Sequence, residues 1–114
     1  GFEDPLNRGT FPWGSEDESL LAFFRRLGQL RAERISMQCG IIRYLHAQGG
    51  GLVVERLHGT ERTVTALNAG DTPLELTLPW DGRLCIDAVT GQQFLSQNGT
   101  VRLTLPPLDG VILV

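Results

Sequence analysis

The sequence contains no lysine, and it has little of several other residue types on which function often depends. All ten basic residues are arginines, they are dispersed along the chain, and the formal net charge is −3. Nucleic-acid binding needs concentrated positive charge, so this distribution argues against it. No apolar stretch approaches the roughly 20 residues that span a membrane, and no signal peptide opens the sequence. Localisation therefore stays open between cytoplasmic and secreted.

Cysteine and histidine are also scarce. Cys39 and Cys85 lie far apart in the sequence, and we expect buried free thiols, while a disulfide between them stays open. His46 and His58 lack partners at metal-ligand spacing, so we expect neither to bind a metal. The sequence also lacks a serine nucleophile elbow, a phosphate-binding loop and a redox motif. These absences predict no catalytic residue of those classes and no cofactor.

One amphipathic helix is predicted over about residues 16–35. Ser15 and Glu18 form a capping box at its start, which makes the acidic cluster at 16–18 a favourable first helical turn rather than a catalytic pair. Its apolar stripe consists of Leu20, Leu21, Phe23, Phe24, Leu27 and Leu30, whereas most of its arginines should lie off that stripe. Gly28 inside the helix predicts close packing against a neighbouring element.

The remaining residues, 37–114, read as an all-β domain. Alternating apolar and polar residues or β-favouring composition predict strands near 40–48, 52–58, 62–68, 74–78, 84–89, 93–95, 101–105 and 110–114. Glycines at 49–51 and the Asn98-Gly99 pair suit tight hairpins. The predicted fold is therefore mainly β, an antiparallel β-sandwich of seven or eight strands with Greek-key or jelly-roll-like connections, preceded by a loop and one helix.

The first fourteen residues contain too much glycine and proline for a helix or a central strand. They nevertheless carry two phenylalanines, a tryptophan, acids and an arginine, a composition that favours a binding surface. Asp4-Pro5-Leu6-Asn7-Arg8, followed by Phe11-Pro12-Trp13-Gly14 and an acidic run, resembles the loop after the last barrel strand in the α-amylase family, glycoside hydrolase family 13. The similarity is strongest to its pullulanase, amylopullulanase and neopullulanase-like branch.

Later segments carry the same resemblance. Leu27-Gly28-Gln29-Leu30-Arg31 is similar to the final barrel helix of the family, and Asp87-Ala88-Val89-Thr90-Gly91 and Leu105-Pro106-Pro107-Leu108-Asp109-Gly110 are similar to the end of its C-terminal β domain. The resemblance implies a C-terminal fragment of a bacterial enzyme that hydrolyses starch, pullulan or maltodextrin with retention. Residues 1–36 would be a remnant of the catalytic barrel, and residues 37–114 a structural sandwich that packs on it.

The resemblance also implies which residues contact substrate. Asp4 and Arg8 would hydrogen-bond glucose hydroxyls, and Trp13 is a weaker candidate for a supporting or stacking role. An Asp-Pro turn in which Asp4 pairs with Arg8 explains the same residues equally well. The family's catalytic motifs, G-x-R-x-D and N-H-D, do not occur, so we expect no catalytic residue and no activity from the fragment alone. A calcium ion in the parent enzyme is compatible with the resemblance but is not indicated by these residues.

Two other functions fit a β-sandwich. An independent carbohydrate-binding module would stack sugars on exposed aromatic rings, for which Tyr44, Trp80 and Trp13 are the candidates. A protein-interaction or structural module would only brace the barrel of its parent protein. Removal of a barrel should leave part of Phe23, Phe24, Leu27 and Leu30 uncovered, and we expect the fragment to self-associate through this helix face.

Overall fold

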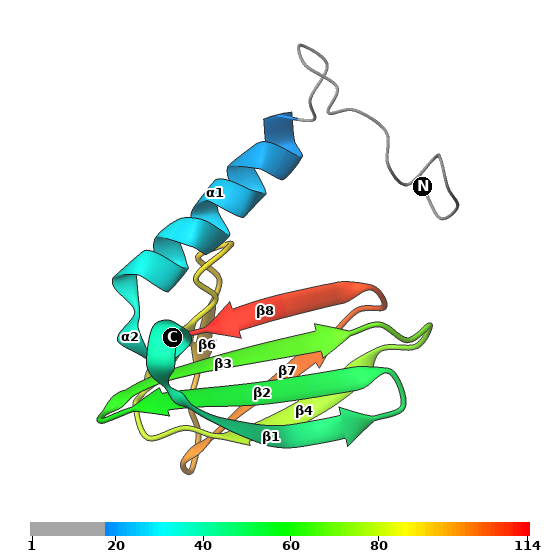
Figure 1. Cartoon of the computed structure of the whole chain (residues 1–114). Helices are drawn as coiled ribbons and strands as arrows, with labels where there is room; N and C mark the ends of the chain where they lie inside the picture. The colour runs from blue at the N-terminus through cyan, green and yellow to red at the C-terminus, as the bar shows by residue number, and fades with distance from the viewer. Residues whose placement is uncertain (1–17) are drawn as a thin grey trace.

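The computed structural model describes residues 18–114 of the chain. This part begins with helix α1 (Glu18–Glu33) and the short helix α2 (Ile35–Cys39). Eight strands follow: β1 (Ile41–Gln48), β2 (Gly51–His58), β3 (Glu61–Asn68), β4 (Leu74–Pro79), β5 (Leu84–Ile86), β6 (Gln93–Leu95), β7 (Thr100–Leu105) and β8 (Asp109–Leu113). The predicted order of one helical region followed by an all-β domain is confirmed (Figure 1).

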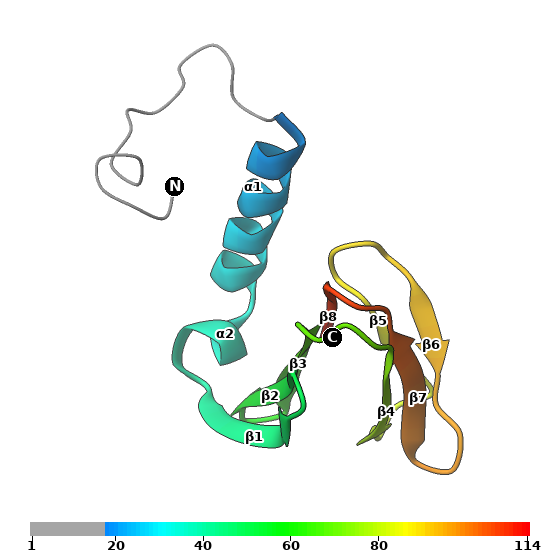
Figure 2. The same ribbon diagram turned by 90° about the vertical axis from the view of Figure 1, so that its right-hand side faces the viewer.

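The strands form two facing layers. One is a four-stranded antiparallel sheet in the order β1-β2-β3-β8, and the other contains the antiparallel pairs β4-β7 and β5-β6. Figure 2 shows the four-stranded sheet on one side and the two pairs on the other. Because β8 returns to lie beside β3, the connections cross between layers, as the predicted antiparallel sandwich requires.

Two hairpin turns use the residues that the sequence singled out. Gly49 and Gly50 join β1 to β2 with φ angles of 59° and 81°, a region that glycine enters without the steric cost of a Cβ atom. Asn98 and Gly99 precede β7 with φ angles of 54° and 75°, as in a type I′ hairpin turn. Each turn therefore helps to set the register of the strands that follow it.

The core lies between the two layers and is built by alternation along the strands. On β2 and β3, Val53, Val64 and Ala66 point inward and are fully buried, and Leu78 and Val101 face them from the β4-β7 pair. Since successive side chains point to opposite faces of a strand, the neighbours of these residues lie on the outer face of the four-stranded sheet.

The sequence predicted one continuous helix over about residues 16–35, but the structure interrupts it at Arg34. Arg34 has extended backbone angles, φ −115° and ψ 109°, and α2 begins after it. The Arg34 guanidinium donates hydrogen bonds to Thr63 Oγ1 and to the Arg62 carbonyl, each at 2.7 Å. These bonds to β3 accompany the break in the helix, a tertiary contact that local periodicity does not reveal.

Helix α1 is held on the sandwich by arginine side chains as well as by its apolar stripe. Arg26 donates two hydrogen bonds to the Ala88 carbonyl, at 2.9 and 3.1 Å. Leu30, one turn later on the same helix face, is buried. Arg34 lies just past the end of α1 and donates to β3. Arg26, Leu30 and Arg34 therefore fix α1 against the sandwich together.

Two further expectations fail. Gly28 does not pack closely, because a Cβ atom built on it would meet nothing within 4 Å. Both cysteines are free, but only Cys85 is buried, whereas Cys39 is exposed at the end of α2. Burial raises the pKa of the Cys85 thiol to about 11, so this thiol stays protonated at neutral pH.

Candidate interaction surface

The outer face of the four-stranded sheet carries more apolar surface than a solvated face would. Cross-strand partners in the sheet share one side, and the register places Tyr44, Val54, Thr65 and Ile112 in one such row. Adjacent rows complete what we call the outer sheet face, formed by Ile42, Tyr44, Leu52, Val54, Arg56, Thr65, Leu67 and Ile112.

Several large side chains of this face are open to solvent. Ile42 is 52% exposed, Tyr44 66% and Leu67 45%. A sheet with one solvated face normally shows polar residues there. Apolar residues on both faces of β1 and β2 were visible in the sequence, and they are the signal by which this surface could have been predicted.

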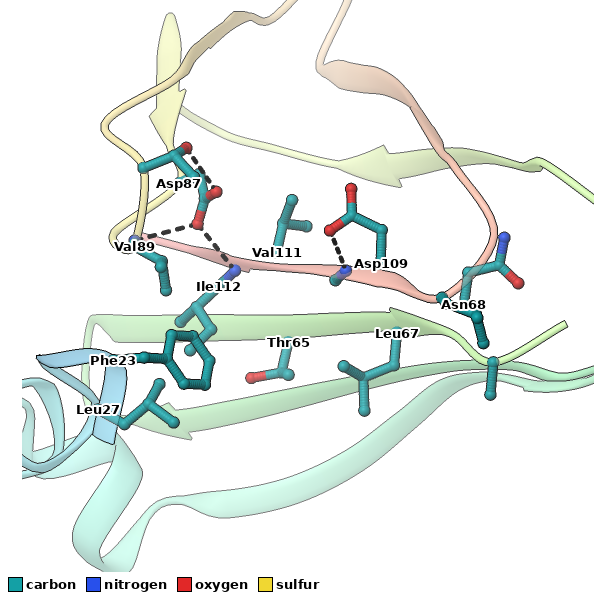
Figure 3. A pocket seen from close by; sticks show the side chains of 14 residues that line it. Phe23, Leu27, Thr65, Leu67, Asn68, Asp87, Val89, Asp109, Val111 and Ile112 are labelled. Atoms are coloured by element: carbon teal, nitrogen blue, oxygen red, sulfur yellow. Dashed lines mark hydrogen bonds between the residues drawn. The ribbon is translucent and has the colours of Figure 1, made fainter. Parts of the chain in front are cut away.

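Helix α1 extends the apolar surface into a groove. Phe23 and Leu27 of the helix lie opposite Leu67 and Ile112 of the sheet, and the space between them measures about 670 Å³. Figure 3 shows these side chains around the groove, with Thr65 at its floor. Phe23 remains 43% exposed and Phe24 59%. The helix stripe is thus partly uncovered.

A buried carboxylate stabilises the rim of this groove. Asp87 is 2% exposed; it accepts hydrogen bonds from the backbone N–H groups of Val89 (3.1 Å) and Ile112 (3.2 Å) and from the Thr90 hydroxyl (2.7 Å). It therefore ties the turn after β5 to β8 (Figure 3). The same turn presents the Ala88 carbonyl to Arg26, so Asp87 also supports the position of α1.

A second polar cluster joins α2 to the sheet. The buried Ser36 hydroxyl lies 2.8 Å from Thr63 Oγ1, and the Ser36 backbone N–H donates to Glu61 Oε2 at 2.6 Å. Hydrogen bonds from the side chain and the backbone of Ser36 hold the pKa of the Glu61 carboxyl below its usual range. Together with Arg34, these groups hold α2 over the outer sides of β2 and β3.

The predicted substrate-contacting residues Asp4, Arg8 and Trp13 lie outside the described residues, as does Ser15 of the predicted capping box. Their assignment stays a prediction. Within residues 18–114, the structure offers no group of three or more histidine, cysteine or acidic side chains arranged to hold a metal ion. In the same range, no helix has the length and hydropathy to cross a membrane.

The aromatic residues of the described part do not form a flat stacking surface. Trp80 is buried, donates its Nε1–H to the Leu84 carbonyl and has the Arg62 guanidinium 4.9 Å from its ring centroid. Tyr44 is exposed on β1. The exposed pair Phe23 and Phe24 meets edge to face at an interplanar angle of 65°. These arrangements do not favour the carbohydrate-binding-module hypothesis, which needs coplanar exposed rings.

Comparisons with known proteins point to one group of enzymes. The chain is 30% identical over 129 aligned residues to an amylopullulanase from Thermoanaerobacter thermohydrosulfuricus, a match that covers 100% of this chain and 9% of the relative. It is 25% identical over 118 residues to a cyclomaltodextrinase from Geobacillus thermopakistaniensis, covering 98% of this chain and 20% of the relative. The solved structure of an Anoxybacillus α-amylase matches with a TM-score of 0.86 and 26% identity, over 97% of this chain and 25% of that chain.

The chain thus spans between 9% and 20% of the lengths of these two curated relatives. No family model matches the sequence. The similarity accordingly concerns one part of much longer proteins, and it extends over almost all of this chain.

Proposed function

We propose that this chain is the C-terminal part of an α-glucan-acting glycoside hydrolase of the α-amylase family, glycoside hydrolase family 13. Its sequence similarity to an amylopullulanase and its structural similarity to an α-amylase support the proposal. The parent enzyme would hydrolyse starch, pullulan or maltodextrin with retention. Residues 1–36 would form the end of its catalytic barrel, and residues 37–114 a structural sandwich that packs on that barrel.

The observation that carries this proposal is the uncovered apolar surface on one side of the molecule. The outer sheet face and the exposed stripe of α1 line the groove between them from two sides. Burial of apolar area stabilises by about 25 cal/mol per Å². A barrel that covered both the outer sheet face and α1 would therefore be stabilised by the apolar area of both. In its absence, the isolated chain would cover the same surface by self-association.

We also propose that Asp4 and Arg8 bind α-glucan in the parent enzyme, with Trp13 in a supporting role. The resemblance of the first fourteen residues to the family loop supports this assignment. A carboxylate acceptor and the five-donor guanidinium fork suit recognition of neighbouring hydroxyls.

Alanine at Asp4 or Arg8 in the complete enzyme is expected to lower kcat/KM for maltodextrin about tenfold or more, because each loses charge-assisted hydrogen bonds to the sugar. Steady-state kinetics would measure the loss, with Asp71→Ala, in the exposed turn before β4, as the matched control. Values equal to those of the control would leave Asp4 and Arg8 as a structural turn and defeat the assignment.

The 114-residue chain alone should neither hydrolyse nor bind the sugar. Retaining glycosidases place two carboxyl groups about 5–5.5 Å apart. The two buried carboxylates of the described part are committed elsewhere: Asp87 to three hydrogen bonds, and Glu55 to ion pairs with Arg43 (2.8 Å) and Arg62 (2.5 Å). This commitment supports the proposal that the chain lacks a catalytic pair.

Calorimetric titration of the isolated chain with maltotriose is therefore expected to give no heat of binding above that of dilution. The loop residues would have no barrel behind them, and Trp80 is buried. Saturable binding that disappears in Tyr44→Ala would instead identify a carbohydrate-binding module and contradict the structural role.

A further inference from the structure

Arg56 on the outer sheet face has no ion-pair partner among residues 18–114. Its register partners are Ile42 on β1 and Thr63 on β3, which places its side chain on the outer side of β2 between an apolar and a polar neighbour. The Nε atom is buried and has no hydrogen-bond partner among the described residues. A buried donor without an acceptor costs free energy that native structures generally avoid.

The nearby charged groups of the described chain are already engaged. Glu55, the preceding residue, points to the opposite face and pairs there with Arg43 and Arg62. Glu61 accepts the backbone N–H of Ser36. The other two arginines between the helices and the sheet, Arg26 and Arg34, donate to backbone carbonyls and to Thr63.

Covering the outer sheet face would remove water from Arg56 as well as from its apolar neighbours. A guanidinium that loses its water without gaining an anion is strongly unfavourable, whereas a guanidinium paired with a carboxylate forms two parallel hydrogen bonds. A complementary covering surface must therefore bring a carboxylate to this position.

We propose that Arg56 is the ion-pairing residue of the outer sheet face, and that it binds a carboxylate on the catalytic barrel that covers this face. The inference rests on the proposed function and names the chemistry of that interface. Apolar contacts along the groove would supply most of the buried area of the interface. The Arg56–carboxylate pair would fix how the sandwich is positioned on the catalytic barrel, because a bidentate pair tolerates little displacement.

The test compares Arg56→Met, which keeps the length of the side chain and removes its charge, with Arg56→Lys, which keeps the charge. Arg102→Met is the matched control, because Arg102 is exposed on β7 in the opposite layer. In the complete enzyme, Arg56→Met is expected to raise the first-order rate of thermal inactivation about tenfold or more. Arg56→Lys should raise it less, and Arg102→Met should leave it unchanged.

The same Arg56→Met variant of the isolated chain should unfold at or above the wild-type temperature, because the carboxylate partner is absent there and methionine removes a buried donor that has no acceptor. Equal destabilisation of the isolated chain would place the partner within the chain and overturn the inference. If Leu67→Glu destabilises the complete enzyme but Arg56→Met does not, the inference about Arg56 is overturned, and the docking role of the outer sheet face remains intact. If neither variant affects the complete enzyme, the proposed function fails together with the inference.

Discussion

Asp87→Ala is expected to lower the free energy of unfolding of the isolated chain by about 3 kcal/mol, because it leaves the partly buried N–H groups of Val89 and Ile112 and the Thr90 hydroxyl without their acceptor. For a chain of this size, such a loss lowers the thermal midpoint by roughly 10 °C or more. The turn after β5 would then no longer be tied to β8, and the Ala88 carbonyl would hold Arg26 less firmly.

Thermal and urea unfolding of matched variants would measure this effect. Asp87→Asn should cost less, since its carbonyl oxygen can still accept one of the backbone N–H bonds. Asp109→Ala is the control: Asp109 is exposed, and its Oδ1 accepts only from the adjacent Gly110 N–H, so a change within about 0.5 kcal/mol is expected. If Asp87→Ala proves no more harmful than Asp109→Ala, the buried network does not stabilise this turn.

Leu67→Glu should have very different effects in the isolated chain and in the complete enzyme. Leu67 is 45% exposed on the outer sheet face, so glutamate there can remain hydrated, and we expect a change of about 1 kcal/mol or less in the isolated chain. In the complete enzyme, the same carboxylate would be buried against the catalytic body, at a cost of about 3 kcal/mol or more.

The difference would appear as a lower thermal midpoint and faster proteolysis of the complete enzyme only. Leu95→Glu is the control for added charge, because Leu95 is 74% exposed on β6, in the opposite layer. Equal tolerance of Leu67→Glu and Leu95→Glu by the complete enzyme would show that the outer sheet face stays in water, and the docking proposal would be wrong. For the isolated chain, Leu67→Glu should also reduce self-association in light scattering.

The fold was predictable because most of its strands alternate cleanly and its turns are marked by glycine. The alternation of Leu74, Leu76 and Leu78 on β4, and the Asn98-Gly99 turn before β7, each specify local structure without help from distant residues. The sequence placed the segment 87–91 in the β domain, and the structure adds that the buried Asp87 carboxylate is the hydrogen-bond acceptor of this turn.

The errors occurred where a distant contact decides the outcome. The break at Arg34 coincides with hydrogen bonds to β3, 28 and 29 residues along the chain. Gly28 was expected to pack closely, yet a Cβ atom built on it would meet no neighbouring element of the described chain within 4 Å. The outer sheet face was missed because the sequence pattern was interpreted as a sandwich with one core, although apolar residues on both faces of β1 and β2 indicate a second packing surface.

The most direct test of the central claim is the coding sequence upstream of Gly1. If the chain is the C-terminal part of an α-amylase-family enzyme, the open reading frame continues through a catalytic barrel that carries the G-x-R-x-D and N-H-D motifs. A start codon placed immediately before Gly1 would contradict that account.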